Sequence, residues 1–510
     1  MSNYENNKRI AKNTTMLYIR MLLVMIVSLY TSRVVLQVLG NEDYGTYQAV
    51  GGIVGLLVFI NTALSQGTSR FLLFEMGKRD SNRLAKLFST MLNAHVIIAL
   101  IIVLLAETIG LWFVYNKLVI ASDRMDAAII VYHLSVVTAF VSITQTPYSA
   151  AIKSHERFDL YAYTSIIEVV LKLVIVYLLT ISPIDKLAFY ALLLCLLSVG
   201  VAMFYRVYCI RHFKETQYNF IFDKDIFKEV TSYCGWNLFS NISVALSTQG
   251  MIVLINMFFS GTIVTSISIA TTVKNQAKGF VDNFRVAAIP QIVKKYAGGE
   301  TEYSKHLLLE TSKYSYFLFI LFGLPIYLES ENILSLWLGQ IPDYSPIFLR
   351  IIVLTAIMEL FTSCMFTTLD VVGKIREYSI IYPLILFATF PLTYFFYKIG
   401  MPPVTVSYVM LVAYMILAFI VMPVLSVRIA KYTLNDIIQL YVPCLKVTLL
   451  SVPIPALAYM YLPIDNAFLH LLIITIVSIL SIGVCIWYVG LNNDVRTLIM
   501  SNVKSKLFRR

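Results

Sequence analysis

The sequence predicts an all-α polytopic membrane protein with about 14 transmembrane helices, arranged as two pseudo-symmetric six-helix lobes and a C-terminal helix pair. Three observations lead to this prediction. Of the 510 residues, 58% are hydrophobic and only 14% are charged, whereas soluble globular proteins carry about 25% charged residues. Apolar stretches of spanning length recur along the whole chain. Lysine and arginine gather in every second connection between these stretches, as the topology of a membrane protein requires.

The predicted helices follow from length and hydropathy. A helix that crosses the hydrocarbon core needs about 20 mostly apolar residues, because lipid offers no partner to an open backbone. The first stretch follows Lys8, Arg9 and Lys12 but is longer than the apolar core of a signal peptide, so we expect it to be retained. The predicted spans are residues 15–39, 46–66, 88–115, 127–151, 160–181, 184–208, 232–258, 262–289, 311–333, 345–370, 378–398, 403–425, 438–462 and 466–490.

The distribution of positive charge predicts the topology. With both termini in the cytoplasm, 27 of the 40 lysines and arginines fall in cytoplasmic segments and 4 in external ones. Missing one span would reverse every later connection and destroy this asymmetry. We expect an N-terminal lobe at 1–208, a central cytoplasmic loop at 209–231, a second lobe at 232–425, and helices 13 and 14 with a basic tail at 426–510. A weak internal echo supports a repeat, because Gly40 and Gly77 recur as Gly261 and Gly298.

Composition and motifs also limit the kinds of partner and site that we expect. The net charge of +11 lies mostly in short loops, which argues against a nucleic-acid partner. The six cysteines form no CxxC pair, so we predict buried thiols, with neither a disulfide framework nor a metal site. No GxxxxGK[ST] motif is present. We therefore expect no cofactor and no catalytic residues, and any transport would use an ion gradient or the membrane potential.

Charged side chains inside the predicted helices are the candidate site. Residues 262–289 carry Lys274, Lys278, Asp282 and Arg285 at spacings that place them on one helix face. Lys278 and Asp282 are expected to pair. A charge at the centre of a bilayer costs at least ~2.5–3.5 kcal/mol, so such a face needs partners or a wet cavity. The surplus of cations favours an anionic substrate, although a salt-bridge network between two helices would have the same pattern.

Further polar residues lie on the first two predicted helices and on the fifth. Arg33 lies on the first helix, either in a cavity or near the external interface, and Arg20 precedes it by 13 residues. Asn61 and Gln66 on the second helix are candidates for the lumen or a gate, or for contacts between helices. On the fifth, Glu168 and Lys172 are four residues apart and are predicted to neutralise each other.

Three short motifs carry a family resemblance. The motifs SRVVLQVLG (Ser32–Gly40), DYGTY (Asp43–Tyr47) and SRFLLFE (Ser69–Glu75) resemble those of the polysaccharide-repeat flippases in the multidrug/oligosaccharidyl-lipid/polysaccharide (MOP) exporter superfamily. A looser similarity covers the rest of the chain. The resemblance implies two lobes that alternate between inward-open and outward-open states in the bacterial inner membrane. It also implies an undecaprenyl-pyrophosphate-linked oligosaccharide as substrate, with other polysaccharide-assembly proteins as partners. Arg33, Lys274, Lys278 and Arg285 match the family's cationic lumen best.

Two other functions remain open from the sequence. A cation-coupled exporter of drugs or metabolites would need an acidic coupling residue, for which Asp282 is the candidate. A membrane enzyme acting on lipid-linked sugars would need Glu42 or Asp43 in the first external loop. The simpler interpretation of those two residues is a polar turn and helix cap, with Gly45 permitting the turn.

Overall fold

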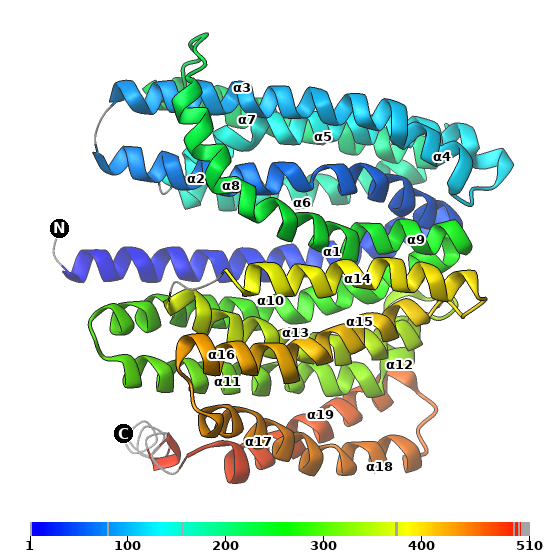
Figure 1. The fold of residues 1–510 in the computed structure, drawn as a ribbon. Coiled ribbons are helices and arrows are strands. Elements are labelled where there is room, and N and C mark those ends of the chain that lie inside the picture. Colours follow the sequence, from blue (N-terminus) through cyan, green and yellow to red (C-terminus); the bar gives the residue numbers. More distant parts are fainter. Residues whose placement is uncertain are drawn as a thin grey trace, which may run out of the picture. The chain divides into compact units, whose positions relative to one another are not determined.

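The computed structural model describes residues 3–78, 81–155, 157–182, 184–372, 376–492, 495–497 and 500, and shows helices joined by short connections (Figure 1). Side chains of residues 3–21 and of some later helical positions are outside this description. Helix dominates because lipid offers no hydrogen-bond partner to the backbone of an apolar segment, and a helix forms all of its backbone hydrogen bonds within the segment. No strand occurs among the described residues. The all-α prediction is therefore confirmed.

The chain divides into two compact units, and each is described by itself. The first comprises residues 1–268 and 382–403, and the second residues 269–381 and 404–510. The division at 268 lies inside one long helix and does not coincide with the predicted domain boundaries. Units defined by their internal contacts need not coincide with the lobes that move during transport. The predicted lobes therefore stay a prediction.

The first unit contains ten helices or helix segments. They are α1 (Asn3–Leu57), α2 (Phe59–Lys78), α3 (Ser81–Leu105), α4 (Leu111–Lys117), α5 (Met125–Ser154), α6 (Phe158–Thr180), α7 (Lys186–His212), α8 (Lys224–Ala245), α9 (Met251–Phe258) and α14 (Tyr378–Lys398), with the first turns of α10 (Gly261–Ala297). α1 is two helices joined at Gly40, whose φ of 83° is a conformation that glycine adopts without steric cost. Single π-turns join α3 to α4 and α8 to α9.

The second unit is built around α13 (Ser345–Val372), most of which is buried. Against it pack α11 (Thr301–Leu328), α12 (Ser330–Leu338), α15 (Thr405–Ile416) and α16 (Met422–Ala430). α17 (Leu434–Ser451) and α19 (Ala467–Cys485) pack on α11, and α18 (Pro453–Tyr461) packs on α19. The rest of α10 belongs to the same unit. Capping side chains determine where several of these helices begin. Thr433 and Asp436 form a reciprocal capping box before α17, and Asn466 accepts two backbone N–H groups before α19.

Each of the fourteen predicted spans coincides with helix within a few residues. By length and hydropathy, twelve helices in the described part of the chain qualify as membrane spans. The predicted spans at 46–66 and 262–289 are not among them as separate spans. The polar side chains of α2 and the charges of α10 lower the hydropathy of these segments. The protein is therefore a multi-pass membrane protein, and the count of fourteen stays a prediction.

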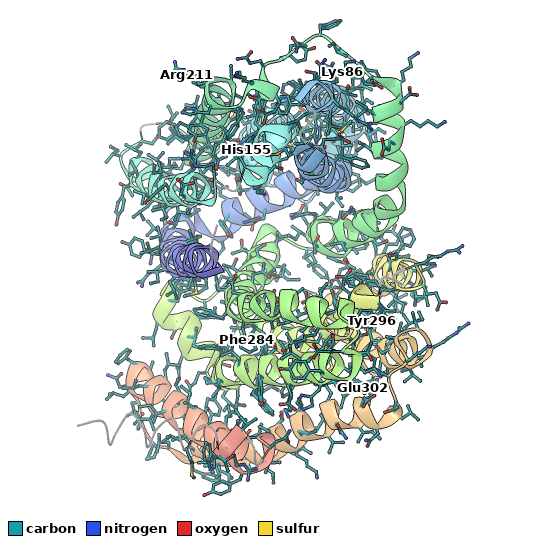
Figure 2. All side chains as sticks on the ribbon, turned by 90° about the vertical axis from the view of Figure 1, so that its left-hand side faces the viewer. Lys86, His155, Arg211, Phe284, Tyr296 and Glu302 are labelled. Carbon is teal, nitrogen blue, oxygen red and sulfur yellow. The ribbon has the colours of Figure 1, made fainter. Side chains whose placement is uncertain are left out.

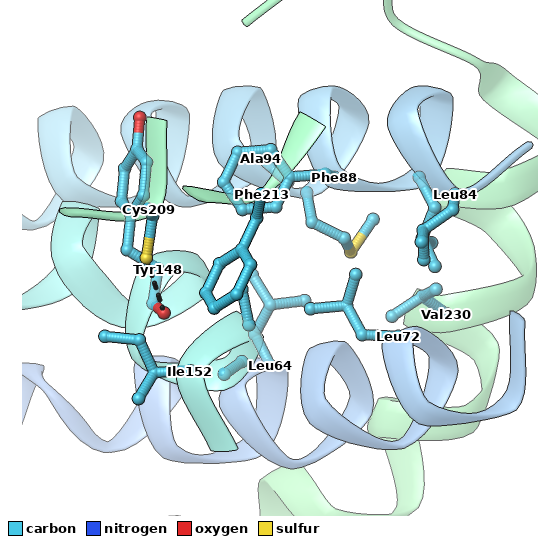
Figure 3. Packing of buried hydrophobic residues seen from close by; sticks show 14 of the residues in the cluster. Leu64, Leu72, Leu84, Phe88, Ala94, Tyr148, Ile152, Cys209, Phe213 and Val230 are labelled. Carbon is cyan, nitrogen blue, oxygen red and sulfur yellow. Dashed lines mark hydrogen bonds between the residues drawn. The ribbon is translucent and has the colours of Figure 1, made fainter. Parts of the chain in front are cut away.

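A hydrophobic cluster holds one end of the first unit together. Leu64, Leu72, Phe88, Met91 and Val230, from α2, α3 and α8, are nearly inaccessible. Figure 3 shows them meeting Tyr148 and Ile152 of α5 and Cys209 of α7. The Cys209 thiol donates to the Tyr148 carbonyl at 3.6 Å. Lys86, His155 and Arg211 surround the same end of this unit (Figure 2). The core thus fixes the helix ends that carry the basic segments.

Cysteines follow the sequence prediction where they are described. Cys195, Cys209, Cys364 and Cys444 are buried free thiols, and Cys485 is a half-buried one. Cys234 lies outside the described side chains.

Candidate functional site: two polar clusters among the helices

A charged cluster joins α10 to α13 within the second unit. Lys274 Nζ lies 3.3 Å from Glu359 Oε2, and Lys278 contacts Glu359 Oε1. The carboxylate is 18% exposed and the two ammonium side chains are 20% and 21% exposed. Two lysines one turn apart therefore share one carboxylate on a neighbouring helix. The three side chains keep one surplus positive charge.

The predicted Lys278–Asp282 pair is wrong. Asp282 instead contacts Arg285 Nη1, at 3.4 Å, and is 43% exposed. Lys278 contacts Glu359 of the adjacent α13 instead. This carboxylate pairs with Lys274 and Lys278 together, whereas Asp282 could have paired with Lys278 alone. No spacing along the chain indicates this partner, because it lies 81 residues away.

Arg285 is the most enclosed of these cations, with a side chain 13% exposed. Its guanidinium donates to the Ser363 hydroxyl at 2.8 Å, to the Ser363 carbonyl at 2.7 Å and to the Thr367 hydroxyl at 3.3 Å. Three hydrogen bonds to α13 fix its fork in place. Arg285 therefore ties α10 to α13, and whether it also meets a substrate stays a prediction.

The remaining predicted site residues have varied surroundings. Asn61 exchanges hydrogen bonds with Thr146 of α5, at 3.3 and 3.4 Å, so it connects two helices. Arg33 is half-buried on α1, just before the buried Val35 and Leu36. The side chains of Arg20 and Gln66 lie outside the described part of the structure.

A second polar cluster, which the sequence reasoning missed, lines a pocket of about 680 Å³ in the first unit. One wall is a face of α5 that carries polar side chains at spacings of three or four residues. These are Thr138, Ser142, Gln145, Ser149 and Lys153. The opposite walls come from α1, α6 and α7 and include Ser28, Tyr47, Ser165, Glu168, Lys172, Ser198 and Tyr205. A smaller pocket of about 180 Å³ adjoins it, because both are lined by Ser28, Tyr47, Val169 and Lys172.

The pocket contains polar groups that the helices do not satisfy. Among the described residues, the side chains of Ser142, Gln145, Ser149 and Ser198 have no hydrogen-bond partner. In contrast, Lys172 Nζ and Glu168 Oε1 form the predicted pair at 2.7 Å, with side chains 42% and 37% exposed. An unsatisfied amide among spanning helices is costly unless water or a ligand reaches it. The pocket is therefore suited to a hydrated or hydroxyl-rich guest.

The segment that follows Gly40, predicted to be the first external loop, is helical and has structural roles for both of its acidic residues. Asp43 takes a bidentate contact from Arg124, with Nε–Oδ1 at 2.8 Å and Nη2–Oδ2 at 2.5 Å. Glu42 accepts from the Gly261 N–H at 3.3 Å and the Thr262 hydroxyl at 3.1 Å, at the start of α10. The capping residue is therefore Glu42, at α10, whereas Asp43 forms an ion pair and the turn lies at Gly40 instead of Gly45.

Gly45 and Gly261 approach each other closely in the same region. A Cβ on Gly45 would lie 1.8 Å from the Gly261 carbonyl oxygen. Only glycine fits at Gly45, because no backbone shift of ordinary size removes such an overlap.

Comparison with known structures shows the fold. A lipid II flippase, MurJ, in an inward-closed conformation superposes with a TM-score of 0.69 at 12% identity, over 93% of this chain and 98% of its own. An inward-facing multidrug-resistance MATE transporter of the MOP superfamily gives 0.67 at 15% identity, over 81% and 98%. A MOP transporter from Pyrococcus furiosus, described as having a binding pocket of reversed polarity, gives 0.58 at 16% identity, over 83% and 97%. No curated protein sequence matches this chain.

A family match of the sequence points in the same direction. Residues 34–283, just under half of the chain, match the family described as polysaccharide biosynthesis protein. The similarity to MOP-superfamily structures concerns the fold. The resemblance carried by Ser32–Gly40 and the motifs that follow it is thereby confirmed. The solved structures that share this fold are described as a lipid II flippase and as multidrug-resistance transporters.

Proposed function

We propose that this protein moves an undecaprenyl-pyrophosphate-linked oligosaccharide repeat unit from the cytoplasmic to the periplasmic leaflet of the bacterial inner membrane, for surface polysaccharide such as O-antigen or capsule. The movement proceeds by alternating access. An ion gradient or the membrane potential drives it. Other polysaccharide-assembly proteins would supply the substrate and receive the product.

The polar pocket of the first unit is the observation that carries this proposal. Its volume of about 680 Å³ falls within the 300–1,000 Å³ range of ligand sites. Hydroxyl and amide groups such as Ser142, Gln145 and Ser149 offer donors and acceptors that a sugar's hydroxyls can use. Tyr47 and Tyr205 add aromatic surface. A lipid-linked sugar needs such a polar environment while its headgroup crosses the hydrocarbon region.

The charges of both clusters support an anionic component. The pocket contains Lys153 and Lys172 with one carboxylate, Glu168, and the α10–α13 cluster contains two lysines with Glu359. Each set of three has one surplus positive charge, which suits a pyrophosphate or a uronic acid. Lys274 and Lys278 remain the candidate contacts in the second unit.

The likeness to MATE transporters favours a second candidate, an exporter of small molecules. An exporter of organic cations is expected to offer a carboxylate without a competing cation. Glu168 and Glu359 are each in contact with lysine, which supports the saccharide substrate over this alternative. An enzyme that uses Glu42 or Asp43 has less support, because both carboxylates are engaged with backbone, hydroxyl or guanidinium groups.

A deletion strain tests the proposal. Surface polysaccharide and undecaprenyl-pyrophosphate-linked oligosaccharide would be measured, together with the leaflet in which the intermediate lies. The proposal predicts loss of surface polysaccharide and accumulation of complete units in the cytoplasmic leaflet. Single units in the periplasmic leaflet would favour the enzyme, and unchanged pools with altered drug tolerance would favour the exporter.

A further inference from the structure

The segment that leads into α8 is fastened along the side of α3. Residues 217–223 follow a short 3₁₀ turn and precede α8 at Lys224. The Asn219 N–H donates to the Ser89 hydroxyl at 3.3 Å, and the Asp223 N–H donates to the Thr90 hydroxyl at 3.1 Å. Asn93 completes the attachment, donating to the Ile221 carbonyl at 3.1 Å and accepting from the Tyr218 hydroxyl at 2.8 Å. The segment therefore has a defined position on α3.

The face of α3 that holds this segment continues as a lipid-facing stripe. Ile97, Leu100 and Leu104 follow Asn93 at helical spacing and are 50%, 55% and 64% exposed. Ile97 lies one turn, about 6 Å, beyond Asn93 along the helix axis. Residues 217–223 therefore border the point where α3 begins to present large apolar side chains to the bilayer.

Large side chains of the segment remain exposed, although the Tyr218 hydroxyl contacts Asn93 and the Phe222 ring packs against Phe227. Phe220 is 95% exposed, and Tyr218, Ile221 and Phe222 are 45%, 38% and 42% exposed. In Figure 1 the chain leading into α8 stands out beyond α3, at a steep angle to the helix axes. An apolar side chain as exposed as Phe220 would be costly in water, but it suits the boundary between headgroups and acyl chains.

Charges of both signs flank these aromatic residues in the sequence. Arg211, Lys214, Lys224 and Lys228 are exposed, and Glu215, Asp223, Asp225 and Glu229 lie among them, so residues 211–229 carry no net charge. The charge distribution places these segments in the cytoplasm. Exposed aromatic groups flanked by lysines suit the headgroup boundary of a membrane, where a lysine can contact a lipid phosphate.

We propose that residues 217–223 form a membrane-surface anchor, in which Phe220 and Phe222 enter the headgroup–acyl boundary of the cytoplasmic leaflet and the neighbouring lysines contact lipid phosphate groups. The anchor holds the cytoplasmic ends of α3 and α8 at a fixed depth. This inference is independent of the substrate proposed above.

Depth-dependent fluorescence quenching in the full-length protein tests the anchor. Phe220→Trp is introduced where Trp112, Trp236, Trp337 and Trp487 are replaced by Phe, and the protein is reconstituted in vesicles of phosphatidylcholine and phosphatidylglycerol. Lipids carrying bromine at shallow or deep acyl positions act as quenchers, and acrylamide reports exposure to water. Because Phe220 is almost fully exposed, its replacement should leave packing intact.

Two control positions calibrate the result. Glu302→Trp lies on an 85% exposed side chain at the start of α11, where water should reach it. Leu104→Trp lies deep on the lipid-facing stripe. We expect the tryptophan at position 220 to lose most of its emission to shallow bromines, less to deep ones, and little to acrylamide.

Acrylamide quenching equal to that at position 302 would overturn the anchor. It would indicate that these aromatic residues contact a partner protein instead of lipid.

Discussion

The pocket of the first unit and the α10–α13 cluster of the second each contain two lysines and one glutamate, but they use these charges differently. In the cluster, Lys274 and Lys278 converge on Glu359, and all three side chains are about one-fifth exposed. In the pocket, Glu168 and Lys172 are roughly twice as exposed and lie beside side chains that lack protein partners. Charges satisfied by one another stabilise a fold, whereas polar groups left open need water or a ligand. The cluster therefore serves mainly stability and the pocket mainly binding.

The largest effect is expected from Glu359→Gln. Removing this carboxylate leaves two enclosed ammonium groups without their shared partner. Breaking such a pair typically costs about 3–5 kcal/mol. Thermal unfolding in detergent, followed by gel filtration, should show a clear loss of stability. Glu302→Gln is the matched control, because Glu302 also contacts a lysine, at 2.8 Å, but is 85% exposed. Equal stability of the two variants would contradict the role assigned to the cluster.

A smaller effect, on transport alone, is expected from Gln145→Leu combined with Ser149→Ala. Each lost hydrogen bond to a substrate is worth about 0.5–1.5 kcal/mol, so affinity should fall roughly tenfold. Unfolding should be unchanged, since neither side chain has a partner in the described structure. Binding of a lipid-linked oligosaccharide to the purified protein measures the change in affinity, and thermal unfolding measures stability. A loss of stability without a loss of affinity would assign these residues to packing.

Removing the pocket's ion pair should change stability only slightly. Glu168→Gln with Lys172→Gln eliminates a contact of 2.7 Å between side chains that are 37% and 42% exposed. Pairs of this kind contribute about 0.3–0.5 kcal/mol. Thermal unfolding should therefore be nearly unchanged, in contrast to Glu359→Gln. A destabilisation as large as that of Glu359→Gln would erase the difference between the two regions.

The smallest effect is expected at the end of the first unit, from Asp185→Asn. Burial works to raise the pKa of Asp185, but the Ala188 N–H and the Arg124 guanidinium outweigh it and hold that pKa below its ordinary value. A lowered pKa contributes stability above the unfolded value, about 3.9, that disappears as pH falls through the folded value. The variant should be slightly less stable than the natural protein at neutral pH and equal to it in strong acid. A difference that persists in strong acid would point to packing.

Much of the fold could be predicted from the sequence because hydropathy and positive charge act locally. The break at Gly40, the Glu168–Lys172 pair and the capping at Asn466 each depend on neighbours in the chain. The partner of Lys278 could not be predicted, because Glu359 reaches it only through the packing of α10 on α13. The polar face from Thr138 to Lys153 has a visible helical period, but the pocket exists only where α1, α6 and α7 meet it.

Movement of the substrate in a reconstituted system tests the central claim most directly. Purified protein would be placed in vesicles that contain an undecaprenyl-pyrophosphate-linked oligosaccharide, and a membrane-impermeant glycosidase would report how fast the sugar changes leaflet. The account predicts movement well above that of protein-free vesicles, lost in the protein that carries Gln145→Leu and Ser149→Ala. Movement no faster than in protein-free vesicles, with an ion gradient and membrane potential applied, would contradict it.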